Sequence, residues 1–207
     1  MKKKVILTII CVFLVAQTVV ADTEEIRRLV DQFEQVARAG LFDSEVYTQE
    51  EIETAIMMTR GEDTRNPVVT SKVYRKALVH AFDFYSKKYD LPSMLFVGMA
   101  LKESEYKNTA HGSRGEEGIL QVGEQGRKYC KEECGAFSLN PDTQICHGFC
   151  WFNAIKNKTC DGSIRQGLYG YSSGRCEPKP SWVNTVKAVR KRYRLWGWLH
   201  LKLGREL

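Results

Sequence analysis

Hydrophobic residues recur at three- and four-residue spacing along most of the chain, which is the pattern of amphipathic α-helices. In the N-terminal half this spacing predicts helices within residues 22–60, among them a short helix at 49–58, and a longer helix over residues 71–89. The polar stretch at residues 60–67 contains turn-forming residues, so we expect a loop between these helices.

The same spacing continues in the C-terminal half of the chain. It predicts helices at residues 93–106, 143–157, 163–171 and 180–199. A polar, glycine-rich loop follows the first of these helices and reaches about Glu117. Residues 118–122 could form a short isolated strand, but no alternating pattern is long enough to build a sheet. The sequence therefore predicts a mainly α fold.

The N-terminus has the pattern of a secretory signal. Three lysines precede an apolar run, Val5–Val20, and Ala21 completes a small-residue cleavage pattern. We expect residues 1–21 to be a signal peptide and the protein to be periplasmic or secreted. The alternative is a retained anchor, although the run is shorter than the about 20 apolar residues of a spanning helix. The rest of the chain is expected to form a helical N-terminal extension at residues 22–70 and a main domain at residues 71–207.

Cysteine usage also fits an exported protein. Apart from Cys11 in the signal, an even number remains, namely Cys130, Cys134, Cys146, Cys150, Cys160 and Cys176. Such a set is typical of disulfides in an oxidising compartment, although four thiolates could instead bind zinc. An uncleaved signal would add a further alternative, in which Cys11 pairs with a domain cysteine.

The spacing of the cysteines suggests how they pair. The first four form two pairs with four-residue spacing, so each pair shares a helix face. Two such faces that meet in a hairpin would join Cys134 to Cys146 and Cys130 to Cys150, which leaves Cys160 with Cys176.

The net charge of the protein says little about its binding partners. The formal net charge is +6, and three of these charges lie in the signal, which leaves about +3 for the rest of the chain. This mildly basic balance suits an anionic wall or lipid surface, and no nucleic-acid partner is expected. Residues 187–194 are rich in lysine and arginine, and residues 195–201 are rich in tryptophan and leucine. This tail could contact an anionic membrane, or it could be a closing helix that packs its aromatic rings on the domain.

A carboxyl group closes the apolar stripe of the predicted helix at residues 93–106. Phe96, Met99, Ala100 and Glu103 fall at positions i, i+3, i+4 and i+7, so they share one helix face. Burial disfavours the charged form of a carboxyl group, and a general acid that protonates a glycosidic oxygen needs its proton near neutral pH. The alternative is that Glu103 turns into solvent at the helix end, as most glutamates do.

The residues around and after Glu103 form four ordered stretches with a recognisable pattern. These are Leu101–Tyr106, Ala110 with Gly115–Val122, Asn140–Gly148, and Tyr171–Gly174. They resemble the Glu-Ser-x-Phe, Ala-x-Ser-x-x-Gly-Ala-x-Gly-Leu-Met-Gln, Asp-Pro with Asn-Ile-x-x-Gly, and Tyr-Asn-Ala-Gly motifs of the soluble lytic transglycosylase family. That family is a branch of the lysozyme-like superfamily, and the resemblance covers about residues 91–195.

The resemblance implies a lysozyme-like α-helical domain with a short β or loop element near its cleft. Glu103 would be the single acid/base that cleaves the bond between N-acetylmuramic acid and N-acetylglucosamine in peptidoglycan, giving a 1,6-anhydro end. Ser104 and Gln121 would bind the glycan, Gly118 would let backbone approach the sugar, and Tyr171 would orient Glu103. No cofactor and no metal ion are expected. Such an enzyme could serve a secretion or phage-entry machine by local cutting of the wall.

Departures from the family pattern leave two alternatives open. Ser172 and Gln144 stand where asparagine is usual, and Glu116 stands beside Glu117 where a small residue is common. A second carboxylate facing the cleft would allow a lysozyme-type muramidase to hydrolyse the same bond with an activated water. The other alternative is a cell-wall-binding or assembly module that keeps the cleft without turnover.

Overall fold

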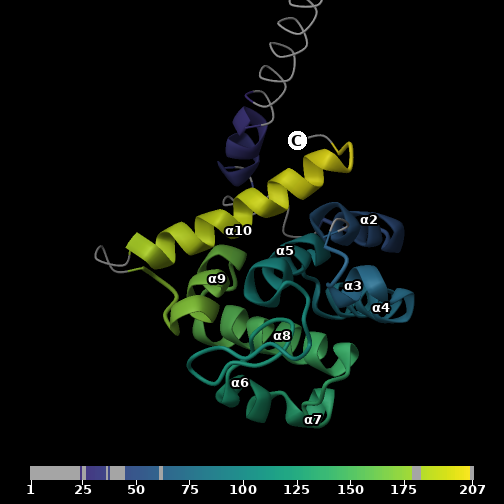
Figure 1. Ribbon diagram of the computed structural model, residues 1–207. Helices are drawn as coiled ribbons and strands as arrows, with labels where there is room; N and C mark the ends of the chain where they lie inside the picture. Colours follow the sequence, from purple (N-terminus) through teal and green to yellow (C-terminus); the bar gives the residue numbers. More distant parts are fainter. Residues whose placement is uncertain are drawn as a thin grey trace, which may run out of the picture.

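The structure is a computed structural model that describes residues 24, 27–35, 37, 45–60, 63–178 and 183–205. The predicted signal peptide, residues 1–21, lies outside these ranges. The described residues are mainly helical, which confirms the predicted class. The helices are α2 Gln49–Arg60, α3 Pro67–Thr70, α4 Lys72–Tyr89, α5 Ser93–Ser104, α6 Glu124–Tyr129, α7 Lys131–Cys134, α8 Pro141–Ala154, the π-helix η1 Ile155–Thr159, α9 Ile164–Ser173 and α10 Val183–Lys202 (Figure 1). Residues 27–35 are helical as well.

Helix α5 is the centre of the fold. Residues 93–100 are all buried, because this part of the helix is apolar or small on every side. Helix α10 lies across it on one side (Figure 1), and α8 contacts it on the other, where the rings of Phe96 and Phe149 stack with their centroids 3.7 Å apart. The whole first two turns are therefore enclosed, and not only the stripe that the sequence predicted.

Local signals place the ends of α4 and the start of α9 close to where the sequence predicted them, whereas the bounds of α5, α8 and α10 differ from the predicted ones by two to three residues. The side chain of Ser71 accepts a hydrogen bond from the backbone N–H of Tyr74 and so caps α4. Asp90 ends that helix in the left-handed conformation, with φ of 51°. Ser163 caps α9 in the same way as Ser71 caps α4. Capping residues fix these boundaries because they satisfy backbone groups that the helix itself leaves without partners.

The segment between α5 and α6 is a loop and not a strand. Within the described residues the only β pairing is at isolated bridges, which join Glu117 to His111 and to Val122. The predicted strand at 118–122 therefore does not form. Gln121 takes a positive φ of 51° in the middle of this segment, which is incompatible with an extended strand.

All three predicted disulfides are present. They join Cys130 to Cys150, Cys134 to Cys146 and Cys160 to Cys176, with Cα–Cα distances of 6.1, 5.7 and 5.3 Å. Sulfurs joined in this way are not thiolate ligands, which removes the zinc alternative. Three disulfides fit a protein of an oxidising compartment.

Residues before Pro67 share the hydrophobic core with the C-terminal helix. The ring of Phe33 packs edge-on against Trp196, with centroids 5.2 Å apart, and the indole N–H of Trp196 donates to the Tyr47 hydroxyl at 2.9 Å. The boundary between an extension at 22–70 and a domain at 71–207 stays a prediction, but both ranges contribute to one continuous cluster of buried side chains.

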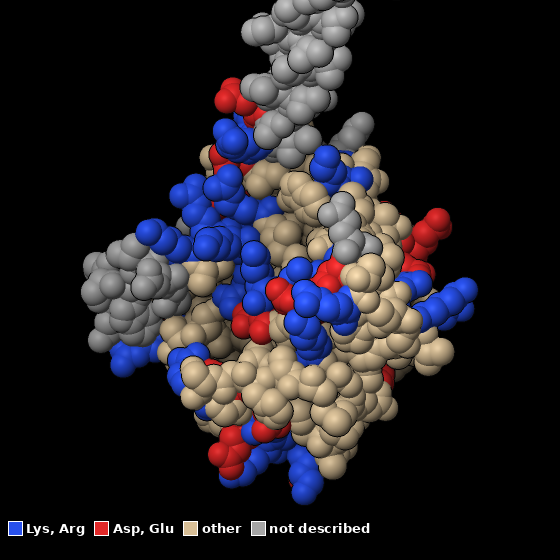
Figure 2. Space-filling view, in the orientation of Figure 1, with Lys and Arg blue, Asp and Glu red and all other residues tan. Residues whose placement is uncertain are grey.

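The basic tail forms most of α10. Figure 2 shows lysine and arginine gathered over this helix and the N-terminal helical segment beside it. Lys187, Arg190 and Lys191 are exposed, whereas Trp196 is fully buried. Burial of this ring favours the closing-helix interpretation of the tail. Across the described part of the chain, no helix combines the length and the apolar character needed to cross a bilayer.

Candidate active site

A cleft of about 810 Å³ opens where the end of α5 meets the loop before α6, the π-helix η1, the ends of α8 and α9, and the middle of α10. Its walls are supplied by the loop at residues 112–116, by Gln121 to Gly126, by the C-terminal parts of α8 and α9, and by α10. Glu103 lies in this cleft together with Gln121 and Tyr171, so the structure brings three of the five predicted site residues into one place. Segments that are far apart in the sequence meet here because α10 lies across α5 and α9 (Figure 1).

Glu103 is paired with an arginine that comes from α10. Its side chain is 22% exposed, and a guanidinium Nη2–H of Arg192, whose side chain is 10% exposed, donates to its Oε1 atom. The Nη1–H of the same guanidinium donates to the hydroxyl oxygen of Ser172. A charged pair shielded from water to this degree interacts more strongly than an ion pair on the surface. The carboxyl group of Glu103 is therefore held in one orientation by Arg192.

Tyr171 lies beside this pair without a hydrogen bond to it. Its hydroxyl donates to the backbone carbonyl of Leu120 at 2.7 Å. Burial raises the pKa of Tyr171, the charge of Glu103 raises it further, and the Arg192 guanidinium opposes both. Tyr171 is therefore a neutral donor that holds the loop, and the side chain that bonds to Glu103 is Arg192. The orienting role of Tyr171 stays a prediction.

Gln121 faces the cleft with its side chain partly engaged. Its amide N–H₂ donates to the carbonyl of Gly118 at 2.9 Å and to that of Ala110 at 3.1 Å. These bonds fix the amide plane against the loop and leave its oxygen as the group that can accept a hydrogen bond from a ligand.

Ser104 and Gly118, which were predicted to contact substrate, lie behind the wall of the cleft. Ser104 is 7% exposed, and its hydroxyl donates to the carbonyl of Ile119 at 2.7 Å. Gly118 has a φ of 76°, and a Cβ atom there would lie 2.5 Å from the Oε1 atom of Gln144. Both residues therefore place the loop, because one bonds to it from α5 and the other leaves room for the side chain that holds it from α8.

Gln144 is the residue that holds the loop from α8. It is buried, its Oε1 accepts from the backbone N–H of Ile119 at 2.9 Å, and its Nε2 donates to the carbonyls of Asn108 and Ser138. Two of these bonds fix two parts of the loop, and the third fixes the segment between α7 and α8. The longer glutamine, in the position where asparagine is usual in the family that the motifs resemble, provides all of these bonds.

Of the two neighbouring acids in the loop, only Glu116 lines the cleft. Its carboxylate accepts from the backbone N–H of Arg114 at 3.0 Å and pairs with the Arg114 guanidinium at 2.8 Å. Burial would raise the pKa of Glu116, but the backbone N–H groups of Glu116 and Arg114 and the guanidinium together hold it below its usual value. Glu117 instead lies 3.6 Å from the Nε atom of Arg127. Glu116 is therefore the second carboxylate that the cleft offers.

Sequence reasoning missed Arg192, although a signal for it was present. Val189, Arg192 and Trp196 lie at i, i+3 and i+7 on α10, and Val189 and Trp196 are buried. A cation on the apolar face of a helix is as unusual as Glu103 at the end of the apolar face of α5. Such a buried cation indicates a buried partner of opposite charge.

Comparison of the chain with protein-family models, with curated proteins and with solved structures found no match. The resemblance to soluble lytic transglycosylases therefore depends on the motifs in the sequence alone.

Proposed function

We propose that this cleft cleaves a glycosidic bond, with Glu103 as the acid/base. The observation that carries the proposal is the position of Glu103, a partly exposed carboxyl group at the end of a buried helix and inside a polar cleft. Polar side chains with amide and hydroxyl groups line the same cleft, as expected for a site that binds a sugar chain. We infer that the protein belongs to the class of lysozyme-like glycan-cleaving enzymes, and the motifs around and after Glu103 support this choice.

Within that class, we propose a peptidoglycan lytic transglycosylase, a lyase that acts outside the cytoplasm. Glu103 gives its proton to the oxygen between N-acetylmuramic acid and N-acetylglucosamine, and the C1–O bond breaks. The carboxylate then takes the proton of the 6-hydroxyl group of the muramic acid as its O6 bonds to C1. Because the nucleophile belongs to the substrate, it is present at a high effective concentration, and one carboxyl group suffices. The four motifs support this choice, and the disulfides agree with export.

A muramidase that hydrolyses the same bond is the second candidate, and one observation favours it. Glu116 lies in the cleft and its pKa is lowered, so it is ionised near neutral pH and could activate a water molecule. Its bonds to Arg114 also fit a structural role, in which Glu116 only shapes the loop.

Mass analysis of the products of purified peptidoglycan separates these candidates. We expect the wild type to release 1,6-anhydro muropeptides and Glu103→Gln to release none. Glu116→Gln should keep more than about a tenth of the wild-type rate if Glu116 only shapes the loop, since one surface ion pair contributes little. Glu117→Gln is the matched control, because it removes the same charge from the next residue outside the cleft.

Two results would contradict the transglycosylase. Reducing-end products that disappear in Glu116→Gln would support the muramidase instead. Wall binding without any product, unchanged in Glu103→Gln, would support the binding or assembly module. The exposed basic residues of α10 would in each case suit contact with anionic wall strands or with an anionic membrane.

A further inference from the structure

The guanidinium of Arg192 is buried more deeply than its hydrogen bonds explain. Arg192 is 8% exposed, and its two Nη groups reach Glu103 and Ser172. Its Nε atom is buried and has no hydrogen-bond partner in the described part of the chain. Burying a cation with an unsatisfied donor costs free energy, and a buried ion pair often stabilises a fold less than apolar side chains of equal size. The burial of Arg192 is therefore better explained by a role in the active site than by a contribution to the stability of the fold.

Ser172 explains how Arg192 stays in place when Glu103 changes its protonation. The Ser172 hydroxyl donates to the Leu168 carbonyl at 2.8 Å, which leaves its oxygen to accept from Arg192. This acceptor does not depend on the charge of Glu103, because the Ser172 hydroxyl is itself held by a backbone carbonyl of α9. The small serine, which stands where the resembling family has asparagine, thus anchors the guanidinium from the side opposite Glu103.

We propose that Arg192 is a positioning residue that stabilises the carboxylate form of Glu103 midway through the reaction. This inference rests on the proposed function. In that reaction Glu103 becomes negatively charged when its proton moves to the glycosidic oxygen, and it loses the charge again when it takes the proton of the 6-hydroxyl group. A cation that is fixed in advance beside the developing charge lowers the barrier without reorganisation. In the structure, the guanidinium of Arg192 already lies beside the Oε1 atom of Glu103, where this charge would develop.

In this role of Arg192, the C-terminal helix α10 is part of the active site. Arg192 lies 89 residues after Glu103 and reaches it only because α10 lies across α5 (Figure 1). The basic residues of α10 are then of two kinds. Lys187, Arg190 and Lys191 are exposed, whereas Arg192 is buried and points to Glu103.

The test compares turnover and binding in variants of the full chain acting on purified peptidoglycan. We expect Arg192→Met to lower kcat by about 10²–10³-fold with little change in KM, as for the loss of one preorganised donor. Arg192→Lys should recover part of this loss because it restores the charge, and Ser172→Ala should lower kcat by about tenfold. Millimolar guanidinium ions should partly restore Arg192→Ala, since the smaller side chain leaves space in the cleft. Arg194→Gln is the matched control, because it removes the same charge from the same helix where the side chain pairs with Asp31 at 3.3 Å and is 41% exposed.

Thermal unfolding of each variant separates a local effect from misfolding. A loss of kcat that follows the loss of folded protein, without rescue by guanidinium, would mean that Arg192 is only structural. If Arg192→Met keeps the wild-type kcat while Glu103→Gln is inactive, the inference fails and the proposed function stands. If the wild type leaves the glycan intact, the proposed function fails and the inference fails with it.

Discussion

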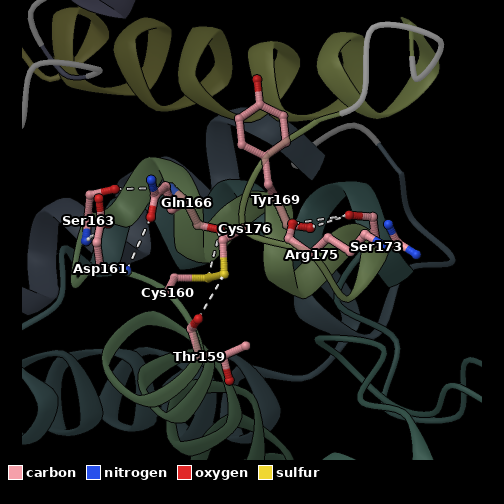
Figure 3. Close-up of a disulfide and its surroundings, with 9 residues drawn as sticks. All are labelled: Thr159, Cys160, Asp161, Ser163, Gln166, Tyr169, Ser173, Arg175 and Cys176. Carbon is pink, nitrogen blue, oxygen red and sulfur yellow. Dashed lines mark hydrogen bonds between the residues drawn. A yellow bond between two sulfur atoms is a disulfide. The ribbon is translucent and has the colours of Figure 1, made fainter.

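The disulfide between Cys160 and Cys176 encloses the helix that carries Tyr171 and Ser172. Figure 3 shows this disulfide between the end of η1 and the segment that follows α9. Both cysteines are partly exposed. The start of α9 is held independently, because the Ser163 hydroxyl accepts from the backbone N–H of Gln166. Replacing both cysteines by serine should therefore leave the native contacts nearly intact and act mainly on the unfolded chain.

The size of the effect follows from the length of the loop. A separation of 16 residues corresponds to a loop-closure contribution of roughly 3 kcal/mol at 25 °C. For a chain of this size such a loss lowers Tm by about 6–12 °C. The serines leave no buried cavity, since neither cysteine is fully enclosed. We therefore expect the free energy of unfolding of Cys160→Ser/Cys176→Ser to fall by about 3 kcal/mol.

The assay is urea unfolding without reductant, after mass analysis has confirmed which disulfides are formed. The double variant Cys130→Ser/Cys150→Ser is the comparison, because its loop is similar in length, with a separation of 20 residues, but its cysteines are buried. It should lose more stability than Cys160→Ser/Cys176→Ser, since it also leaves a defect in the core. Equal midpoints for the wild type and Cys160→Ser/Cys176→Ser, or a larger loss there than for the buried pair, would refute the reasoning.

Two further changes test the packing and the electrostatics away from the cleft. The hydrogen bond from Arg205 is the main cause that lowers the pKa of Glu51 from 4.5 to about 2, against the opposing effect of burial. Because the pKa of Glu51 is lower in the folded state, its ionised form stabilises the fold above the unfolded pKa, and this stabilisation disappears as the pH falls from about 4.5 to about 2. Glu51→Gln should therefore have a lower free energy of unfolding than the wild type at pH 7 and an equal one near pH 2. Urea unfolding at each pH measures this difference. A Cβ at Gly148 would lie 2.1 Å from Leu120 Cδ1, so Gly148→Ala should lose about 1–3 kcal/mol on thermal unfolding, whereas Gly123→Ala, with no atom within 4 Å of its Cβ, should not.

The sequence predicted the elements whose signals are local. Helix α4 begins after Ser71 and ends before Asp90, because a capping side chain and a left-handed residue act over a few residues. Two of the disulfides followed from four-residue spacing, because a helix face fixes which cysteines can meet, and the third joins the two cysteines that remain. The short helices α6 and α7 were not predicted, since six and four residues contain too little periodicity to recognise.

Predictions about the site were limited by contacts between distant segments. The position of Glu103 at the end of α5 could be predicted, because it depends on the periodicity of one helix. Whether Ser104 faces the glycan or the loop depends on where Ile119 lies, and no local pattern reports that. The pair between Glu103 and Arg192 depends on the packing of α10 across α5, which periodicity suggests only as an unexplained charge on a buried face.

The N-terminal extension contacts the site through α10 and not across the cleft. Among the described residues, all those that line the cleft lie between Glu103 and Arg192, so no part of the extension that the structure describes covers the opening. Instead, the extension packs on α10, where Tyr47 bonds to the Nδ1 atom of His200 at 2.8 Å and Phe33 lies against Trp196. These contacts hold the C-terminal part of α10, the helix that carries Arg192. In the described part of the chain, the residues before Pro67 therefore support the helix that brings this cation to Glu103 and do not cover the cleft.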